Sequence, residues 1–186
     1  MHSLRLLPVL ITAALVPVGC ANEPPSAPSP VKVAFDEGWG QVFLADADGS
    51  ALRQITPTTT VDSTDDRYST YPAPSPDGTQ LAYTRPERFI DIVDLDSGQS
   101  RTLHEGGYQP IFSPDGTSIA FSSSDGINIT NTDSSDVRVI TEQDSAFGAA
   151  FSPDGSRVIF ATDGYLAEVP VAGGEPTVLL RDQFWN

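Results

Sequence analysis

The chain has 186 residues and a formal net charge of −15, with 25 acidic residues against 10 lysines and arginines. Such a surface repels phosphate backbones, which argues against nucleic-acid binding, and its plainest consequence is solubility. The 2 histidines and the single cysteine are too few for a zinc cluster, and a lone cysteine cannot form an internal disulfide.

Residues 1–19 are predicted to be an export signal. Arg5 gives the segment a positive start, and the stretch from Leu6 to Val18 is apolar apart from Thr12 and two prolines. The 13 residues of this stretch are fewer than the roughly 20 that a bilayer-spanning helix needs. The segment therefore predicts export rather than a membrane span.

The export signal runs into Cys20, and the residues around it resemble the lipobox of bacterial lipoproteins. Gly19 precedes the cysteine as in the family, whereas Pro17 stands where the family usually has Leu. The resemblance implies that Cys20 is acylated and holds the protein at the bacterial cell membrane, as part of the cell envelope. A plain secretory signal with an incidental cysteine is the alternative. Residues 20–30 contain four prolines and predict an extended tether.

Residues 31–186 are predicted to form one all-β domain, whose first unit has three strands. Its acidic turn, Asp46-Ala47-Asp48, suggests an EF-hand, but Pro57 occupies the twelfth position, where a calcium loop needs Glu. The turn is therefore predicted to be held by its own hydrogen bonds. The three expected strands are Val31–Phe35, Gln41–Ala45 and Leu52–Thr56.

The stretch from Pro57 to Thr70 interrupts the regular spacing and is rich in Thr, Ser and Asp. Long loops on a rigid scaffold often carry binding residues. A binding loop and a surface insertion without a role are both compatible with this composition.

The remainder of the domain repeats a Ser-Pro-Asp-Gly turn three times, 38 to 39 residues apart. Proline favours the second position of a type I turn, and the glycine supplies the positive φ of a bulged hairpin loop. The three consecutive apolar residues after each turn predict a strand buried on both faces. The turns are Ser75–Gly78, Ser113–Gly116 and Ser152–Gly155, and the apolar trios are Leu81–Tyr83, Ile119–Phe121 and Val158–Phe160.

Each unit also has a second hairpin, at turns such as Asp94-Leu95-Asp96. The unit therefore holds four short strands in about 40 residues, which is the make-up of a β-propeller blade. An apolar residue follows each second turn at a fixed distance and marks the fourth strand: Ile55, Leu103, Ile140 and Val178. Two positions before these residues stand Arg53, Arg101, Arg138 and, in the last unit, Pro176.

Taken together, these turns resemble the TolB-type propeller repeat, which also occurs in tricorn-like and prolyl-oligopeptidase-like propellers. The resemblance covers roughly Val31 to Asn186. It implies an all-β fold, a β-propeller of four-stranded antiparallel blades. About four blades are expected, with the first incomplete, as a small closed ring or a partial propeller.

Two interpretations of the last residues compete. Phe184 and Trp185 have the apolar character of the strand that the first unit lacks, so they could close a ring of four blades. In that case, deleting Gln183 to Asn186 should give a less stable, self-associating protein. Alternatively, the chain is the front part of a longer propeller, since TolB-type propellers usually have more blades.

The turns within blades and the connections between them are expected to place the binding residues on one rim. His104 is expected to be a solvated loop residue rather than a catalytic base, because the sequence has no Gly-x-Ser-x-Gly nucleophile elbow. No catalytic residue, cofactor or metal is expected. The candidate rim residues are Asp62, Asp65, Asp66, Arg67, Tyr68, Tyr71, Arg85, Arg88, His104 and Tyr108.

The sequence therefore predicts a cell-envelope lipoprotein whose propeller is a non-catalytic protein- or ligand-binding module, with an envelope protein or peptide as its partner. One alternative is the propeller portion of a prolyl-oligopeptidase-like peptidase, or of another envelope enzyme, whose catalytic domain is absent from this chain. Another is a binder of cations or glycans, which rests on the acidic loops alone.

Overall fold

The computed structural model describes residues 32–36, 41–56, 71–85, 88–133 and 136–181. The export signal, Cys20, the tether, the insertion at 57–70 and the last residues, with Phe184 and Trp185, lie outside the described residues. Among the described residues, no helix has the length and apolar character needed to cross a membrane.

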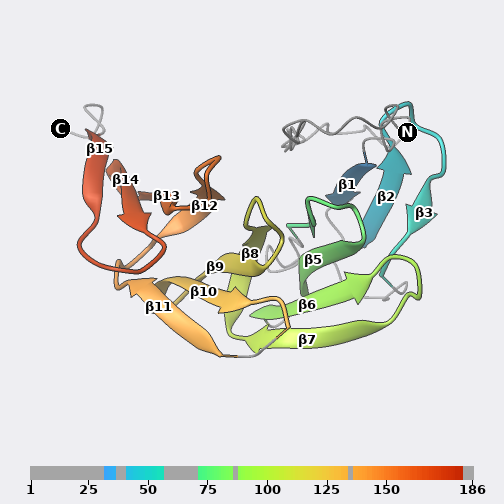
Figure 1. Cartoon of the computed structure of the whole chain (residues 1–186), viewed down its shortest axis with the longest axis horizontal. Coiled ribbons are helices and arrows are strands. Elements are labelled where there is room, and N and C mark those ends of the chain that lie inside the picture. The colour runs from blue at the N-terminus through green and yellow to red at the C-terminus, as the bar shows by residue number, and fades with distance from the viewer. Residues whose placement is uncertain (1–31, 37–40, 57–70, 86–87, 134–135, 182–186) are drawn as a thin grey trace, which may run out of the picture.

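The described elements are β-strands in four antiparallel sheets, which we call blades 1 to 4 (Figure 1). Within a complete blade we name the strands A to D in chain order. Blade 1 lacks strand A and contains β1 (Lys32–Asp36), β2 (Val42–Asp46) and β3 (Arg53–Gln54). Blade 2 contains β4 (Ala73–Pro74), β5 (Gln80–Arg85), β6 (Phe89–Asp94) and β7 (Ser100–Glu105). Blade 3 contains β8 (Gly107–Phe112), β9 (Ser118–Ser123), β10 (Gly126–Asn131) and β11 (Val137–Thr141), and blade 4 contains β12 (Phe147–Phe151), β13 (Arg157–Thr162), β14 (Tyr165–Pro170) and β15 (Thr177–Arg181).

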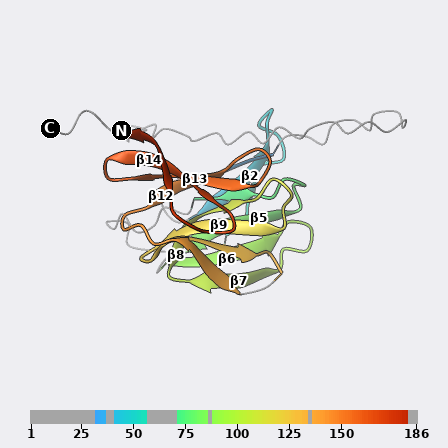
Figure 2. The same ribbon diagram turned by 60° about the vertical axis from the view of Figure 1, so that its left-hand side comes forward.

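The predicted blade architecture is confirmed. Three sheets have four strands in the order A-B-C-D, and the first has three, in the order B-C-D. The blades stand side by side in an open arc, with blades 1 and 4 at its ends (Figure 1). In Figure 2 the molecule is turned so that blade 4 comes toward the viewer. The described sheets do not close into a ring, so the fold is a partial propeller. The predicted closing strand at Phe184 and Trp185 stays a prediction.

Strand alternation sorts the side chains of strands B and C onto two faces. We call the face toward the preceding blade the backward face and the face toward the following blade the forward face. The backward residues Leu81 and Tyr83 pack with the forward residues Val42 and Leu44 of blade 1. The same pattern joins Phe121 to blade 2 and Phe160 to blade 3. Burial of apolar surface between blades is thus the main stabilising contact.

The apolar trios are buried as predicted, except for one residue of blade 4 that is only partly buried. Leu81, Ala82, Ile119, Ala120 and Phe121 are each fully buried. In blade 4, Val158 and Phe160 are fully buried, but Ile159 between them is only half-buried. Ile159 points forward, and no described blade follows blade 4.

The Ser-Pro-Asp-Gly turns are built from local hydrogen bonds. The carboxylate of Asp115 accepts from the Ser113 hydroxyl at 2.5 Å and from the Thr117 amide at 3.0 Å. Such bonds favour the charged carboxylate, the one from the serine hydroxyl most strongly. They lower the pKa values of Asp77 and Asp115 and bring the pKa of Asp154 to about 2.

These turns also meet across blades. Gly116 has φ +73°, and a Cβ atom there would lie 3.6 Å from Cδ of Pro76 in the preceding blade. At Gly155 the corresponding distance to Cδ of Pro114 is 3.5 Å. The proline of one turn therefore lies against the glycine of the next.

A second contact between blades comes from the arginines that recur in strand D. Arg53 of blade 1 donates to the carbonyl of Leu95 in blade 2 at 2.9 Å, and Arg138 of blade 3 donates to that of Val171 in blade 4 at 2.8 Å. Arg101 of blade 2 donates in the same way to Thr132. A repeated side chain of strand D thus ties each blade to the C–D turn of the next.

In the last unit, the predicted positions of the arginine and of the apolar residue of strand D are wrong by one residue. Ile90 pairs with His104 and Asp91 with Thr102, so Leu103 lies in a bulge between them. In blade 4, Leu166 pairs with Leu180 and Ala167 with Val178, so the residue in the bulge is Leu179, not Val178. Likewise Thr177, not Pro176, takes the place of the arginine, because it pairs with Glu168 as Arg138 pairs with Ile129. The spacing from strand C to strand D is the same in each blade, for example from Ile129 to Arg138 and from Glu168 to Thr177. The predicted alignment was wrong because it began at Val169, whereas Pro170 stands at the position of Asp94.

Candidate functional site

The structure brings together four of the predicted binding residues at the end of blade 2 where strands B and C are joined. We call Arg85, Arg88, His104 and Tyr108 the rim cluster. The amide of Gly106, between β7 and β8, donates to the carbonyl of Arg88 at 2.8 Å and so fixes the B–C turn against the connection to blade 3. The other candidates, Asp62, Asp65, Asp66, Arg67 and Tyr68, lie outside the described residues, and Tyr71 is described but lies apart.

Arg85 ends β5 and forms an ion pair across the sheet. Its Nε atom lies 2.9 Å from Oδ2 of Asp91, and its guanidinium lies 4.4 Å from the centre of the Phe89 ring. The Nη2 atom also donates to the Thr102 hydroxyl at 3.4 Å. The arginine side chain is 43% exposed whereas that of Asp91 is 9% exposed, so the pair joins a buried acid to the rim.

Asp91 is a residue that the sequence reasoning missed. Its Oδ1 atom is buried and accepts no hydrogen bond within the described part of the chain. Burial, and next the charge of Asp91, raise the pKa of its cross-strand neighbour Tyr83 to about 12. The signal was present in the sequence, since a single acid stands between Ile90 and Ile92 in an apolar strand. A buried carboxylate oxygen with spare acceptor capacity is costly unless something pairs with it.

Arg88, which is exposed, and Tyr108, which is half-buried, lie next to each other in the rim cluster. The guanidinium of Arg88 lies 5.2 Å from the centre of the Tyr108 ring, within the range of a cation–π contact. No acidic side chain of the described residues forms an ion pair with Arg88. Arg88 also has φ +65°, a backbone conformation that few residues other than glycine adopt. The cluster thus presents a charged group and an aromatic ring held next to each other.

His104 is not a solvated loop residue, and that prediction is wrong. It lies within β7, which continues to Glu105, and its ring packs against Phe121 of blade 3 at 4.8 Å. Burial lowers the pKa of His104, while the negative charges of Glu105 and Asp125 act in the opposite direction. The strand extends this far because Ile90 and Phe89 of β6 pair with His104 and Glu105. The connection to blade 3 is therefore Gly106 alone.

Tyr71 belongs to a different feature, a repeated distortion of the innermost strand. Tyr71, Gln109 and Gly148 all stand four residues before the serine of a Ser-Pro-Asp-Gly turn, and all have positive φ (44°, 55° and 63°). The pairing of β8 with β9 and that of β12 with β13 shift at this position. A residue with positive φ thus recurs at this position in blades 2 to 4, and in β8 and β12 it coincides with a bulge. The repeat pattern did not predict it because no single residue type marks it.

The bulges also connect neighbouring blades along the inner side of the arc. The amide of Gln109 donates to the Thr84 hydroxyl of blade 2 at 3.2 Å, and its Oε1 atom accepts from the Gly148 amide of blade 4 at 2.9 Å. Ser122 takes the place of Thr84 in blade 3, but Gly148 already donates to Gln109. The fully buried Ser122 hydroxyl consequently has no partner among the described residues.

No metal site accompanies the rim cluster within the described part of the chain, where no three His, Cys, Asp or Glu side chains are grouped to hold an ion. A hollow of about 350 Å³ lies between blades 3 and 4, lined by residues that include Thr141, Gln143 and Glu175. None of its lining residues belongs to the rim cluster.

No protein-family model matches the sequence, and a search of curated proteins finds no match. Among solved structures, TolB from Acinetobacter baumannii is similar with a TM-score of 0.61 and 24% identity, over 75% of this chain and 37% of that one. A putative TolB from Agrobacterium tumefaciens gives a TM-score of 0.62 and 24% identity, over 81% of this chain and 60% of that one.

A third similar structure is an oligogalacturonate lyase from Vibrio parahaemolyticus, with a TM-score of 0.55 and 16% identity, over 80% of this chain and 50% of that one. At these identities the likeness concerns the fold. The fold is that of a TolB-type β-propeller, and the chain spans between 37% and 60% of the length of these three proteins.

Proposed function

We propose that this TolB-type β-propeller is the non-catalytic binding module of an exported cell-envelope lipoprotein, anchored through Cys20, and that its rim cluster binds a protein or peptide partner. The export signal and the cysteine that follows it motivate the location. A propeller supplies a rigid frame on which rim residues can be held for binding, so the proposal rests on the rim cluster rather than on the fold.

The observation that carries the proposal is the pairing of Arg88 with Tyr108. In a chain of net charge −15 with only 10 basic side chains, the rim cluster contains two arginines and two aromatic rings. A guanidinium binds carboxylates through paired hydrogen bonds, and tyrosine and arginine are enriched in binding hot spots. The chemistry therefore fits a peptide segment that presents an acidic side chain next to an apolar one.

Photo-crosslinking in cells tests the proposal. Tyr108 is replaced by a photoreactive phenylalanine derivative, and the control carries the same group at Ser97, which is exposed in the C–D turn at the opposite end of blade 2. We expect a discrete cross-linked protein from position 108 only. Adding Arg88→Ala should reduce its yield. Equal products from both positions, or a yield unaffected by Arg88→Ala, would contradict a role of the rim cluster.

A second candidate function is that of the propeller portion of an envelope enzyme. Two observations favour it: the chain spans only part of the proteins that it resembles, and one of these is a lyase. Determining the reading frame beyond the codon for Asn186 separates the two proposals. A continuation that encodes a Gly-x-Ser-x-Gly elbow would favour the enzyme.

A further inference from the structure

Neighbouring blades pack with the forward face of one on the backward face of the next. Each end of the arc presents one of these faces, and no described blade covers it. Among the described residues, no blade precedes the backward face of blade 1 and none follows the forward face of blade 4. Because alternation fixes which residues point each way, both faces can be identified position by position from the pairing of strands B and C.

The backward face of blade 1 has the residues that bind a preceding blade. The pair of Phe35 with Phe43 occupies the same place between strands B and C as the pair of Tyr83 with Asp91 in blade 2. Phe35 therefore stands at the position of Tyr83, Phe121 and Phe160. Those three aromatic residues are 7%, 0% and 0% exposed. Phe35 is only half-buried and stacks on Phe43 at 5.7 Å. Val33, the neighbouring backward residue, corresponds to Leu81 and is also half-buried.

The forward face of blade 4 has the complementary residues. Leu166 stands at the position of Ile90 and Leu180 at that of His104, and these leucines are 36% and 65% exposed. Leu179, at the position of Leu103, is 46% exposed, whereas Leu103 is 3% exposed. Exposed apolar patches of this kind mark interaction surfaces.

The contact between blades 2 and 3 shows which of these positions touch. His104 lies 4.8 Å from the ring of Phe121, and a Cβ atom at Gly107 would meet both Ile90 and Phe121 at less than 3 Å. Ile90 and His104 thus form the surface on which Phe121 packs. By the same register, Leu166 and Leu180 form a surface for an aromatic residue at the position of Phe35.

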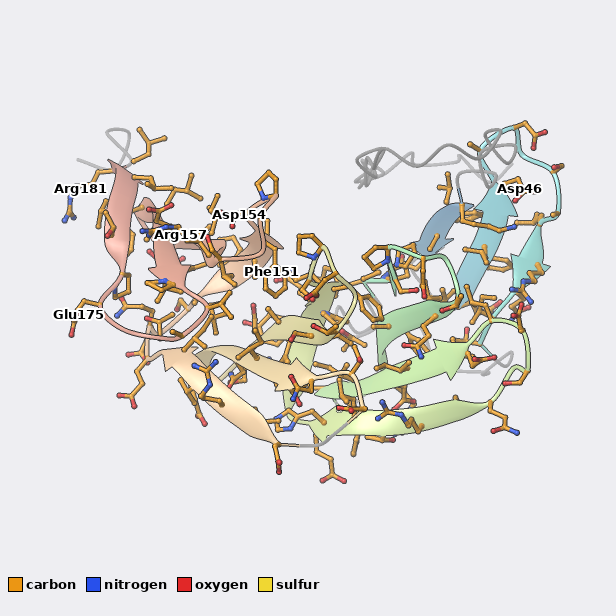
Figure 3. The ribbon with its side chains drawn as sticks, in the orientation of Figure 1. Asp46, Phe151, Asp154, Arg157, Glu175 and Arg181 are labelled. Atoms are coloured by element: carbon orange, nitrogen blue, oxygen red, sulfur yellow. The ribbon has the colours of Figure 1, made fainter. Side chains whose placement is uncertain are left out.

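We propose that this occupant is Phe35 of a second copy of the chain, so that the forward face of blade 4 in one copy packs on the backward face of blade 1 in the other. In one chain the two faces lie at opposite ends of the arc, as the positions of Asp46 in blade 1 and Arg181 in blade 4 show (Figure 3). Two copies related by a twofold axis satisfy both ends at once, which closes the assembly at a dimer. The contact continues the packing that already joins blades 1 to 4.

Charge on the interface is compatible with this packing. Glu168 replaces the forward isoleucines Ile92 and Ile129, but Arg157 lies 2.8 Å from its carboxylate and neutralises it. The net charge of −15 on each copy opposes association at long range. At 0.1 M salt, charges more than about 10 Å apart are largely screened from one another. Association should therefore strengthen as the salt concentration rises, as expected for an apolar contact between two acidic molecules.

Analytical ultracentrifugation of the full chain tests the dimer, with Cys20→Ser in every sample so that acylation does not contribute. We expect a concentration-dependent dimer. Leu180→Glu should make the protein monomeric, since it places a charge against Phe35 in both contacts of the dimer. The matched control is Val139→Glu, because Val139 is 39% exposed in strand D of blade 3, away from both ends. This control should remain dimeric.

Mixing two variants identifies the head-to-tail arrangement. Phe35→Glu and Leu180→Glu should each be monomeric alone, whereas an equimolar mixture should associate, because one of the two contacts then joins two unmodified faces. A contact between identical faces would leave one of the two variants fully dimeric. Circular dichroism checks the folding of each variant.

A protein that stays monomeric at all concentrations and salt levels overturns the proposal. So does a Leu180→Glu variant that dimerises like the Val139→Glu control. Growth into open oligomers instead of dimers would overturn the twofold arrangement. If Phe35→Glu does not fold, the comparison of Leu180→Glu with Val139→Glu still decides, since Leu180 is 65% exposed and its substitution leaves the core intact.

Discussion

Phe121→Ala should cause the largest loss of stability among substitutions of single side chains between blades 2 and 3. Phe121 is fully buried and packs with Ala82, Ile90 and Leu103 of blade 2. Truncating a buried phenylalanine costs about 3–5 kcal/mol, since transfer energy is lost and a cavity remains. This is a large part of the 5–15 kcal/mol that usually stabilises a domain.

Urea unfolding followed by tryptophan fluorescence or circular dichroism measures this loss. With a slope of about 2 kcal/mol per molar urea, the unfolding midpoint should fall by roughly 2 M. The matched control is Phe147→Ala, which removes the same atoms from a side chain that is 42% exposed.

A second measurement checks the same contact without unfolding the protein. Burial is the main cause that lowers the pKa of His104, and the Phe121 ring lies 4.8 Å away. Removing that ring admits water, so the pKa of His104 should rise toward its ordinary value in an NMR titration of the folded variant. Equal urea midpoints for Phe121→Ala and Phe147→Ala, together with an unchanged His104 pKa, would refute the assignment of Phe121 to the blade contact.

Three further predictions concern the turns, the arginine contacts and the anchor. Because the folded-state pKa of Asp154 is lowered from 3.8 to about 2, its carboxylate stabilises the fold above pH 3.8 and loses that effect as the pH falls toward 2. The melting temperature should therefore fall less steeply through this window in Asp154→Asn than in the wild type, and parallel curves would contradict the role of the turn. Arg138→Met keeps the aliphatic stem but removes the bond to the Val171 carbonyl, so it should lower the free energy of unfolding by about 1–2 kcal/mol, and more than Arg181→Met. Cys20→Ser should release the protein from the membrane fraction of cells, because stable anchoring takes acyl chains, and unchanged fractionation would rule out the lipid anchor.

The sequence by itself determined the strands and turns of the propeller, because these depend on contacts a few residues apart. The Ser-Pro-Asp-Gly turn is held by bonds within five residues, such as those of Ser113 and Asp115, so its three copies predict three hairpins. Successive side chains of a strand point to opposite faces. Three consecutive apolar residues therefore predict that both faces of the strand are buried. The rim position of Arg85 and Arg88 followed from the order of the strands.

Tertiary structure decided what depends on a neighbouring blade. The packing of His104 on Phe121, the unpaired oxygen of Asp91 and the shift from Val178 to Leu179 arise from pairings between strands, which spacing alone does not reveal. The exposure of Phe35 is the clearest case. Phe35 ends an apolar trio as the fully buried Phe121 does, yet Phe35 is half-buried, because burial requires a preceding blade and no described blade precedes blade 1.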